Sequence, residues 1–297
     1  MSESLTSASS ASEQRRSPAL AMLERSFAYG RVRFGLVLTA SVVALALIGP
    51  FVAPHARTDF VGVPYAGPSK GALLGADYLG FDVLTQVLYG GRSILWMAAT
   101  AISLGVAVGV ALGMLAGYSR GLLDDAIMRT LDLQHAFPGI VFVLLFVSML
   151  GPHLWLIVLL VALSNVPGVA RVTRGITVEV ATRDFVKAAQ VLGVSRRRIL
   201  VREILPNLMT PLLVEYTLRL TWAIAAIAAI SFLGFGVQPP DTDWGLMINQ
   251  NRNGLTIQPW AVVVPILCIA AFTIGTNSIG EGMSRAIAGV DRQVDRS

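Results

Sequence analysis

Apolar residues along the chain fall into six blocks, which are separated by polar segments rich in Gly, Pro or charged residues. A helix needs about 20 mostly apolar residues to cross roughly 30 Å of hydrocarbon, and most of the blocks approach this length. The pattern therefore predicts an all-α integral membrane protein with about six transmembrane helices. The expected spans are residues 35–53, 93–118, 136–150, 154–170, 211–233 and 260–279.

Small residues in these blocks predict how the helices pack. Glycine recurs at every fourth position in the second block, and such a face lets another helix approach closely. Only three residues, 151–153, separate the third and fourth blocks, which predicts a tight turn between antiparallel spans. The recurring glycines are Gly105, Gly109, Gly113 and Gly117.

The fifth block contains two charged residues, Glu215 and Arg219. Residues four apart lie on one face of a helix, so these two side chains can form an ion pair. Pairing lowers the cost of placing them in a membrane.

The composition agrees with a membrane protein. The chain has 297 residues, of which 54% are hydrophobic and 14% charged, and its mean hydropathy is +0.66. A soluble domain usually carries about 25% charged residues, so this chain cannot cover itself with a water-facing surface. A soluble enzyme and a nucleic-acid-binding protein are thereby excluded. The single cysteine, Cys268, excludes a disulfide scaffold.

Basic residues are distributed unevenly among the polar segments. With the N-terminus placed inside, 18 of the 23 Lys and Arg residues lie on the inside and four on the outside. The positive-inside rule therefore predicts a multi-pass protein with both termini in the cytoplasm. The expected organisation is a disordered, basic tail at 1–34, a first span and outer loop at 35–92, a core domain at 93–285 and a tail at 286–297.

The sequence contains none of the catalytic or phosphate-binding motifs sought. It has no G-x-x-x-x-G-K-[ST] loop, no H-E-x-x-H and no G-x-S-x-G. Its three histidines, His55, His135 and His153, are assigned to two different sides of the membrane and cannot form one metal site. We therefore predict that the chain is not an enzyme and has neither a metal site nor a cofactor of its own.

The segment 179–206, on the expected cytoplasmic side, has the pattern of two short helices. Phe185, Ala188, Ala189 and Leu192 recur at i, i+3, i+4 and i+7, which places them in one stripe of the first helix. This stripe has two possible interpretations. The segment is either an amphipathic hairpin on lipid headgroups, with Arg196–Arg198 binding anionic lipid, or a rigid knob that another protein grips.

The ends of these two helices are also predicted from the sequence. Thr182 or Asp184 can cap the start of the first helix, and Gly193 stands where a helix ends in a left-handed residue. Ser195 can cap the second helix, which Pro206 is expected to terminate.

This segment resembles a known loop. Lys187-Ala188-Ala189, then Gly193, then Leu205-Pro206 are similar to the EAA loop of binding-protein-dependent ABC importer permeases. Lys187 stands where the consensus has Glu, and Glu203 where it has Ile. The order of helix, glycine and helix is nevertheless preserved.

Three further motifs resemble the dipeptide/oligopeptide/nickel branch of this family. Residues 231–245 are similar to its signature F-L-G-x-G-x-Q-P-P-x-x-x-W-G. Residues 74–82 resemble its run L-G-T-D-x-x-G-R-D, with Ala76 and Phe81 in place of Thr and Arg, and residues 124–138 resemble its run D-x-x-x-M-R-x-x-D…P-G. The matches cover about residues 73–285 in the family's order, and they imply a type I ABC importer permease fold.

The resemblance also implies a function and partners. It implies a permease subunit of the bacterial inner (plasma) membrane that forms half of a pathway for di- or oligopeptides, with residues 93–285 as the core permease domain. The implied partners are a second homologous permease, two ATP-binding subunits, a solute-binding protein and membrane lipid. ATP and Mg would be bound by the ATP-binding subunits. The residues implied to couple the chain to the ATPase are Asp184, Phe185, Lys187, Ala188, Ala189, Gly193, Ser195, Arg196, Leu205 and Pro206.

Two other groups of residues are candidates for function. The first would form an extracytoplasmic platform for the solute-binding protein, or a turn that shapes it: Gln238, Pro239, Pro240, Asp243, Trp244 and Gly245. The second consists of polar residues inside the spans, which line a pathway or pack helices. Its members are Asn165, Thr221, Ser231, Thr273 and Asn277.

Other functions remain as alternatives at this point. A nickel or glutathione importer of the same family fits the motifs as well as a peptide importer does. An ion-coupled secondary transporter would place charged residues within its spans, where this chain has almost none besides Glu215 and Arg219.

Overall fold

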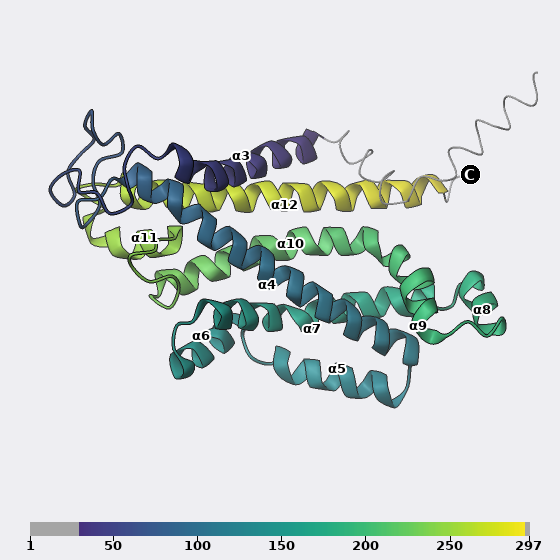
Figure 1. Ribbon diagram of the computed structural model, residues 1–297. Helices are drawn as coiled ribbons and strands as arrows, with labels where there is room; N and C mark the ends of the chain where they lie inside the picture. The colour runs from purple at the N-terminus through teal and green to yellow at the C-terminus, as the bar shows by residue number, and fades with distance from the viewer. Residues whose placement is uncertain (1–29, 295–297) are drawn as a thin grey trace, which may run out of the picture.

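The computed structural model describes residues 30–294 as a bundle of long helices (Figure 1). Most of the expected tail at 1–34 lies outside the described residues. No β-strand is assigned within 30–294, so the all-α prediction is confirmed. The elements are α3 (Gly30–Val52), α4 (Val83–Ser119), α5 (Leu122–His135), α6 (Gly139–Leu150), α7 (Leu154–Val180), α8 (Asp184–Val191), α9 (Arg196–Arg198), the π-helix η1 (Ile199–Ile204), α10 (Leu205–Phe232), α11 (Trp244–Asn251), the 3₁₀-helix η2 (Arg252–Gly254) and α12 (Trp260–Val294).

The number of spans agrees with the prediction, although the third span has a different form. Five helical segments are long and apolar enough to cross a membrane, and the number is six when α5 and α6, which are bent by 76° relative to each other, are counted together as one span. The helix α6 has only 12 residues, or about 18 Å, so it cannot cross the hydrocarbon alone. The bend falls at Pro138, which lacks an N–H and disfavours helical geometry in the preceding residue.

The last helix continues beyond the expected span at 260–279. The last helix, α12, runs on to Val294. Most of the segment 286–297, expected as a tail, is therefore helical where it is described.

Successive spans run in alternate directions (Figure 1). The start of α3, the α4–α5 junction, α8, α9 and the end of α12 lie at one end of the bundle, here called the α8 end. The loop 53–82 and α11 lie at the opposite end, here called the α11 end. Six spans that alternate in direction require the connecting segments to be divided between the two ends in this way.

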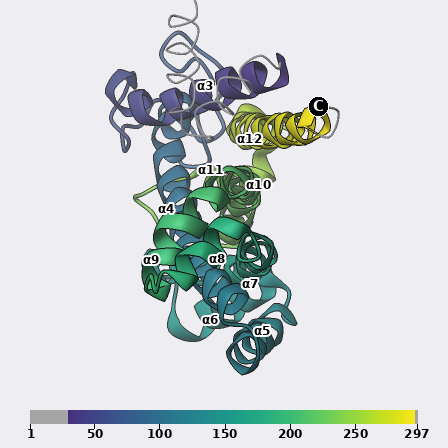
Figure 2. The ribbon, with the colours of Figure 1, turned by 90° about the vertical axis from the view of Figure 1, so that its right-hand side faces the viewer.

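The helices form layers, with α3 and α12 outermost on one side, then α4 and α10, then α7, and α5 with α6 on the other side (Figure 2). The glycines of α4 form a closely packed helix contact, as predicted, and the structure shows that the partner is α7. A β-carbon on Gly105 would lie 2.7 Å from the carbonyl oxygen of Ala162, and one on Gly113 would lie 2.5 Å from that of Ala170. Only glycine permits this close approach.

Candidate functional site: the segment 179–206 and its surroundings

Gly193 ends α8 in the predicted left-handed conformation, with φ of +72°. Its N–H donates to the Gln190 carbonyl at 3.0 Å, and the Val194 N–H donates to the Ala189 carbonyl at 3.0 Å. These two bonds define a Schellman motif. No atom lies within 4 Å of a β-carbon placed on Gly193, so glycine is needed here for backbone conformation and not for space.

The predicted N-cap residues of α8 are wrong, whereas Ser195 does stand at the predicted N-cap of α9. The N-cap of α8 is Arg183, and no side chain caps this helix. Thr182 donates its hydroxyl hydrogen to the Glu179 carbonyl at 2.6 Å instead. Ser195 is the N-cap of α9, but its side chain accepts no capping hydrogen bond.

Pro206 does not terminate the second helix, contrary to the prediction. A continuous helical segment extends from Arg196 to Phe232. In the π-helix η1, the Leu205 N–H donates to the Leu200 carbonyl, five residues back. Pro206, which has no N–H, therefore stands where the hydrogen-bond pattern already shifts. The hairpin of α8 and α9 is thus continuous with α10.

Three of the four stripe residues on α8 face outward, whereas Ala189 is half-buried and packs on the cluster that contains Val186. Phe185 is 40% exposed and Leu192 is 81% exposed, and Ala188 is exposed as well. The side chain that holds α8 to the bundle is Val186, which is fully buried with Ile199. The periodicity identified the stripe but did not show that its neighbour Val186 is the anchor.

Polar contacts near α8 also hold the hairpin in place. The Gln190 side-chain amide donates to the Tyr118 hydroxyl at 3.2 Å, which connects α8 to the end of α4. Lys187 pairs with Asp184 at 3.6 Å on the exposed surface. Arg196–Arg198 are exposed and form no ion pair within 30–286, so they leave positive charge at the α8 end.

At the α11 end, two residues of the other motif point into the protein. Trp244 is fully buried, and its ring N–H donates to the Val87 carbonyl at 3.0 Å. A β-carbon on Gly245 would lie 2.4 Å from the Ala228 carbonyl oxygen. Both residues therefore fix α11 against α4 and α10.

Asp243 is the N-cap of α11. One of its carboxylate oxygens accepts the Leu246 N–H at 2.8 Å, and the other accepts the Ser231 hydroxyl at 2.7 Å. Burial raises the pKa of Asp243, while the Ser231 hydroxyl and backbone N–H groups act to lower it. Ser231, a candidate for lining the pathway, is fully buried and bonded to Asp243.

The outer surface of this end has its own cavity, of about 330 Å³, between the loop 53–82 and the segment before α11. Pro239, Pro240 and Asp241 line it, and Asp241 forms an ion pair with Arg57. Gln238 is exposed and donates to the Gly234 carbonyl at 2.9 Å. Arg57 could not be recognised from the sequence, because its ion-pair partner Asp241 is 184 residues away.

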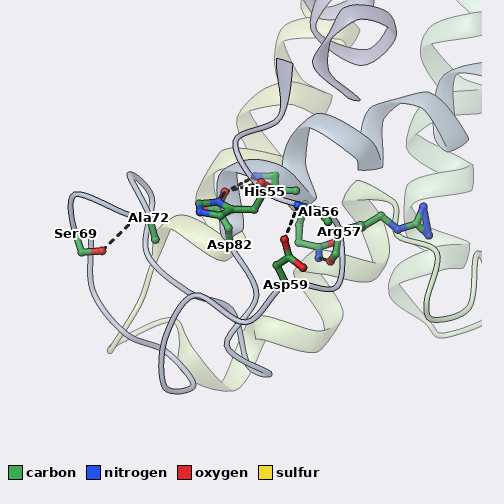
Figure 3. Close-up of polar contacts among 9 residues, drawn as sticks. His55, Ala56, Arg57, Asp59, Ser69, Ala72 and Asp82 are labelled. Carbon is green, nitrogen blue, oxygen red and sulfur yellow. Dashed lines mark hydrogen bonds and ion pairs between the residues drawn. The ribbon is translucent and has the colours of Figure 1, made fainter. Parts of the chain in front are cut away.

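The loop 53–82 is held together by polar contacts (Figure 3). Asp82 caps α4 by accepting the Thr85 N–H at 3.0 Å, and it also contacts His55 Nδ1 at 3.4 Å. The final Asp of the motif at 74–82 thus begins a transmembrane helix.

A second cavity, of about 420 Å³, lies between α6, α7 and α10. Asn165 lines it, unlike the other four pathway candidates. Thr221 instead contacts the Thr276 hydroxyl at 2.7 Å between α10 and α12. Thr273 is half-buried on α12, and Asn277 donates to Glu281 at 3.0 Å.

Comparison with known proteins identifies the class of this membrane protein. Residues 109–288 match the family described as "Binding-protein-dependent transport system inner membrane component". The glutathione transport system permease protein GsiD of Escherichia coli is 34% identical over 248 residues, covering 83% of this chain and 82% of that protein. The dipeptide transport system permease protein DppC of Haemophilus influenzae is 32% identical over 260 residues, covering 85% and 88%.

A solved structure shows the same fold. A chain of the MetNI methionine ABC transporter, in an inward-facing conformation, superposes with a TM-score of 0.51 at 16% identity. The superposition covers 65% of this chain and 94% of that one. The type I importer fold is thereby confirmed.

These findings define a multi-pass membrane permease. The chain belongs to the family of binding-protein-dependent transport system inner membrane components. It is an ABC importer permease of the dipeptide/oligopeptide branch, as its four motifs predicted.

Proposed function

We propose that this chain forms half of the translocation pathway of an ATP-driven importer for short peptides. Its partners in this proposal are a second homologous permease, two ATP-binding subunits that bind ATP and Mg, and a solute-binding protein that delivers the substrate. The observation that carries the coupling role is the exposed apolar stripe of α8, which is held rigidly by Gly193 and Val186.

The geometry supports a mechanical link between this stripe and the membrane. The α8 hairpin is continuous with α10 through η1, and Val186 packs with Ile199 of η1. When the ATP-binding subunits close on ATP, a hairpin gripped by them moves with them and carries α10. The pathway then alternates between inward and outward openings, because the partners contact the two states differently.

Charge supports an orientation with the α8 end in the cytoplasm. Most Lys and Arg residues of the described polar segments belong to this end, including Arg196–Arg198. Both chain termini then lie in the cytoplasm, and the α11 end faces the solute-binding protein.

The relatives support short peptides as the substrate class. DppC is a dipeptide permease by name, and GsiD, a glutathione permease by name, has a similar identity to this chain. Glutathione, itself a small peptide, is therefore the second candidate. The family favours either of these over the ion-coupled alternative.

A purification from the native membrane tests this proposal. The tagged chain is isolated in mild detergent, and co-eluting subunits, ATPase activity and uptake of labelled di-alanine, tri-alanine and glutathione into proteoliposomes are measured. Phe185→Asp places a charge in the stripe, and Phe60→Asp is the matched control, because Phe60 is 74% exposed at the α11 end.

We expect two ATP-binding subunits and a second permease to co-elute with the wild type and with Phe60→Asp. Phe185→Asp should lose the ATP-binding subunits. A wild-type chain that elutes alone, under conditions that preserve other importers, would contradict the proposal.

A further inference from the structure

The cavity between α6, α7 and α10 contains an aromatic side chain at an unusual depth. Trp222 lines it and is 76% exposed. Tryptophan in membrane proteins favours the two interfaces, whereas Trp222 lies about 15 Å before the end of α10 at Phe232, which is about half of the hydrocarbon thickness. An exposed indole at this depth, beside a cavity, indicates a contact other than interface anchoring.

Asn165 supplies the polar part of the same cavity wall, and its amide is fixed from two sides. The side-chain NH₂ donates to the Val161 carbonyl at 2.8 Å. The side-chain oxygen accepts from Arg219 at 3.3 Å. An asparagine amide has two donors and two acceptor lone pairs, so one N–H and one lone pair remain. This pair of groups complements the C=O and N–H of a peptide bond.

Arg219 is itself held in place within the membrane. Its guanidinium donates to Glu215 with Nε at 2.7 Å and contacts the same carboxylate through NH2 at 2.5 Å. It also donates to the Asn165 backbone carbonyl at 3.3 Å, which joins α10 to α7. Charged residues inside a span are costly and are generally paired and functional. Here the pair leaves no net charge and orients a neutral amide.

Gly168 makes room for this arrangement. A β-carbon on Gly168 would lie 2.3 Å from NH2 of Arg219 and would push the guanidinium away. Because the displaced atom is the end of a flexible side chain, the helix itself is expected to tolerate alanine there. Glycine at position 168 therefore leaves the space that the Arg219 guanidinium occupies.

We propose that the imported peptide contacts this chain in the α6–α7–α10 cavity, through the Asn165 amide and the Trp222 ring. Arg219, fixed by Glu215 and accommodated by Gly168, is the positioning residue that orients Asn165. Recognition through a backbone amide does not depend on peptide side chains, which suits a carrier of many short sequences. The inference rests on the proposed peptide-import function and deepens it.

Cysteine labelling in the assembled importer tests the cavity. The single native cysteine is removed as Cys268→Ser, and Ser164→Cys, next to Asn165 in the cavity wall, is the reporter. Leu163→Cys is the matched control, since Leu163 is 36% exposed and does not line the cavity. A water-soluble cationic thiosulfonate should modify the reporter at least tenfold faster than the control. Tri-alanine, or S-methylglutathione if glutathione is the substrate, should slow labelling of the reporter at least threefold during ATP-driven uptake. The S-methyl form is used because the free thiol of glutathione would itself consume the thiosulfonate.

The positioning role has its own readout. Gly168→Ala in the reporter background should leave subunit assembly and reagent access intact but abolish protection by the peptide. Gly175→Ala is the control, because no atom lies within 4 Å of a β-carbon there, and protection should persist. A change that merely loosened the helix pair would instead reduce assembly.

Three results would overturn the inference: equal labelling of reporter and control, no protection by either peptide, or full protection in Gly168→Ala. In each of these cases subunit co-elution and ATP-driven uptake would still support the importer. Loss of co-elution and uptake in the wild type would instead contradict the proposed function.

Discussion

The two ends of the bundle use their sequence motifs in opposite ways. At the α8 end, Phe185, Ala188 and Leu192 of the stripe project outward, with Leu192 81% exposed. At the α11 end, Asp243 and Trp244 are fully buried and tie α11 to its neighbours. The first motif therefore leaves apolar side chains uncovered within the described chain. The second places Asp243 and Trp244 inside the fold, while its residues 238–240 stay exposed.

This difference determines what a substitution should damage. Removing a buried group leaves a cavity or an unsatisfied hydrogen bond, so changes at the α11 end should lower the stability of the chain. Changing an exposed side chain costs little folding energy. At the α8 end the loss should appear in the binding of partners instead.

The largest effect is expected for Trp244→Ala. It removes a fully buried ring and its hydrogen bond to the Val87 carbonyl, which should cost about 3–5 kcal/mol of stability. Trp222→Ala is the control, because Trp222 is 76% exposed. In thermal unfolding of the purified complex, Trp244→Ala should unfold at a clearly lower temperature than Trp222→Ala. Equal unfolding temperatures would contradict the view that the motif at the α11 end stabilises the fold.

A smaller loss of stability is expected for Asp243→Asn. The buried carboxylate accepts hydrogen bonds from Ser231 and Leu246, and an amide replaces one acceptor by a donor. The cost should be about 1–3 kcal/mol. Asp241→Asn at the exposed end of the Arg57 ion pair should cost no more than about 1 kcal/mol. Denaturation of both variants measures the difference, and a larger loss in Asp241→Asn would show that the outer ion pair holds this end.

Gly193→Val should have a smaller effect on stability and a clear effect on assembly. A β-carbon at φ of +72° costs about 1–2 kcal/mol, and relief of this strain would open the turn after α8. The ATP-binding subunits that co-purify with the chain should therefore decrease. Gly175→Val, in an open helical position, should retain them. Unchanged co-purification in Gly193→Val would mean that the turn is not needed for docking.

The sequence predicted those features that depend on short-range patterns. The apolar blocks predicted the spans, and the glycines of α4 predicted a close helix contact. Gly193 predicted the turn after α8. Each of these features depends on a local chemical property. Pro206 was wrongly predicted to end the second helix. The π-helix η1 before it already shifts the hydrogen-bond pattern, so the helix continues although Pro206 has no N–H. The division of the third span at Pro138 was missed because the apolar run continues on only one side of it.

The candidate sites were harder to predict, because burial depends on contacts between distant residues. Val186 and the stripe residue Phe185 are adjacent and both apolar, yet only Val186 is buried, in a cluster that includes Ile199 of η1. Asn165 and Arg219 are 54 positions apart and meet only when α7 and α10 pack. The spacing of Glu215 and Arg219 predicted their ion pair but not its third partner.

The smallest effect on stability, and the sharpest contrast, is expected for Leu192→Asp. Leu192 is 81% exposed on the stripe, so its replacement should change the stability of the chain by less than about 0.5 kcal/mol. A partner that buries this side chain would have to bury an uncompensated charge instead, which is costly. The amount of co-purified ATPase should fall at least tenfold while the unfolding temperature stays constant. If the ATPase remained bound, the exposed stripe would be a lipid-facing surface, and binding of the variant to anionic vesicles would then fall instead.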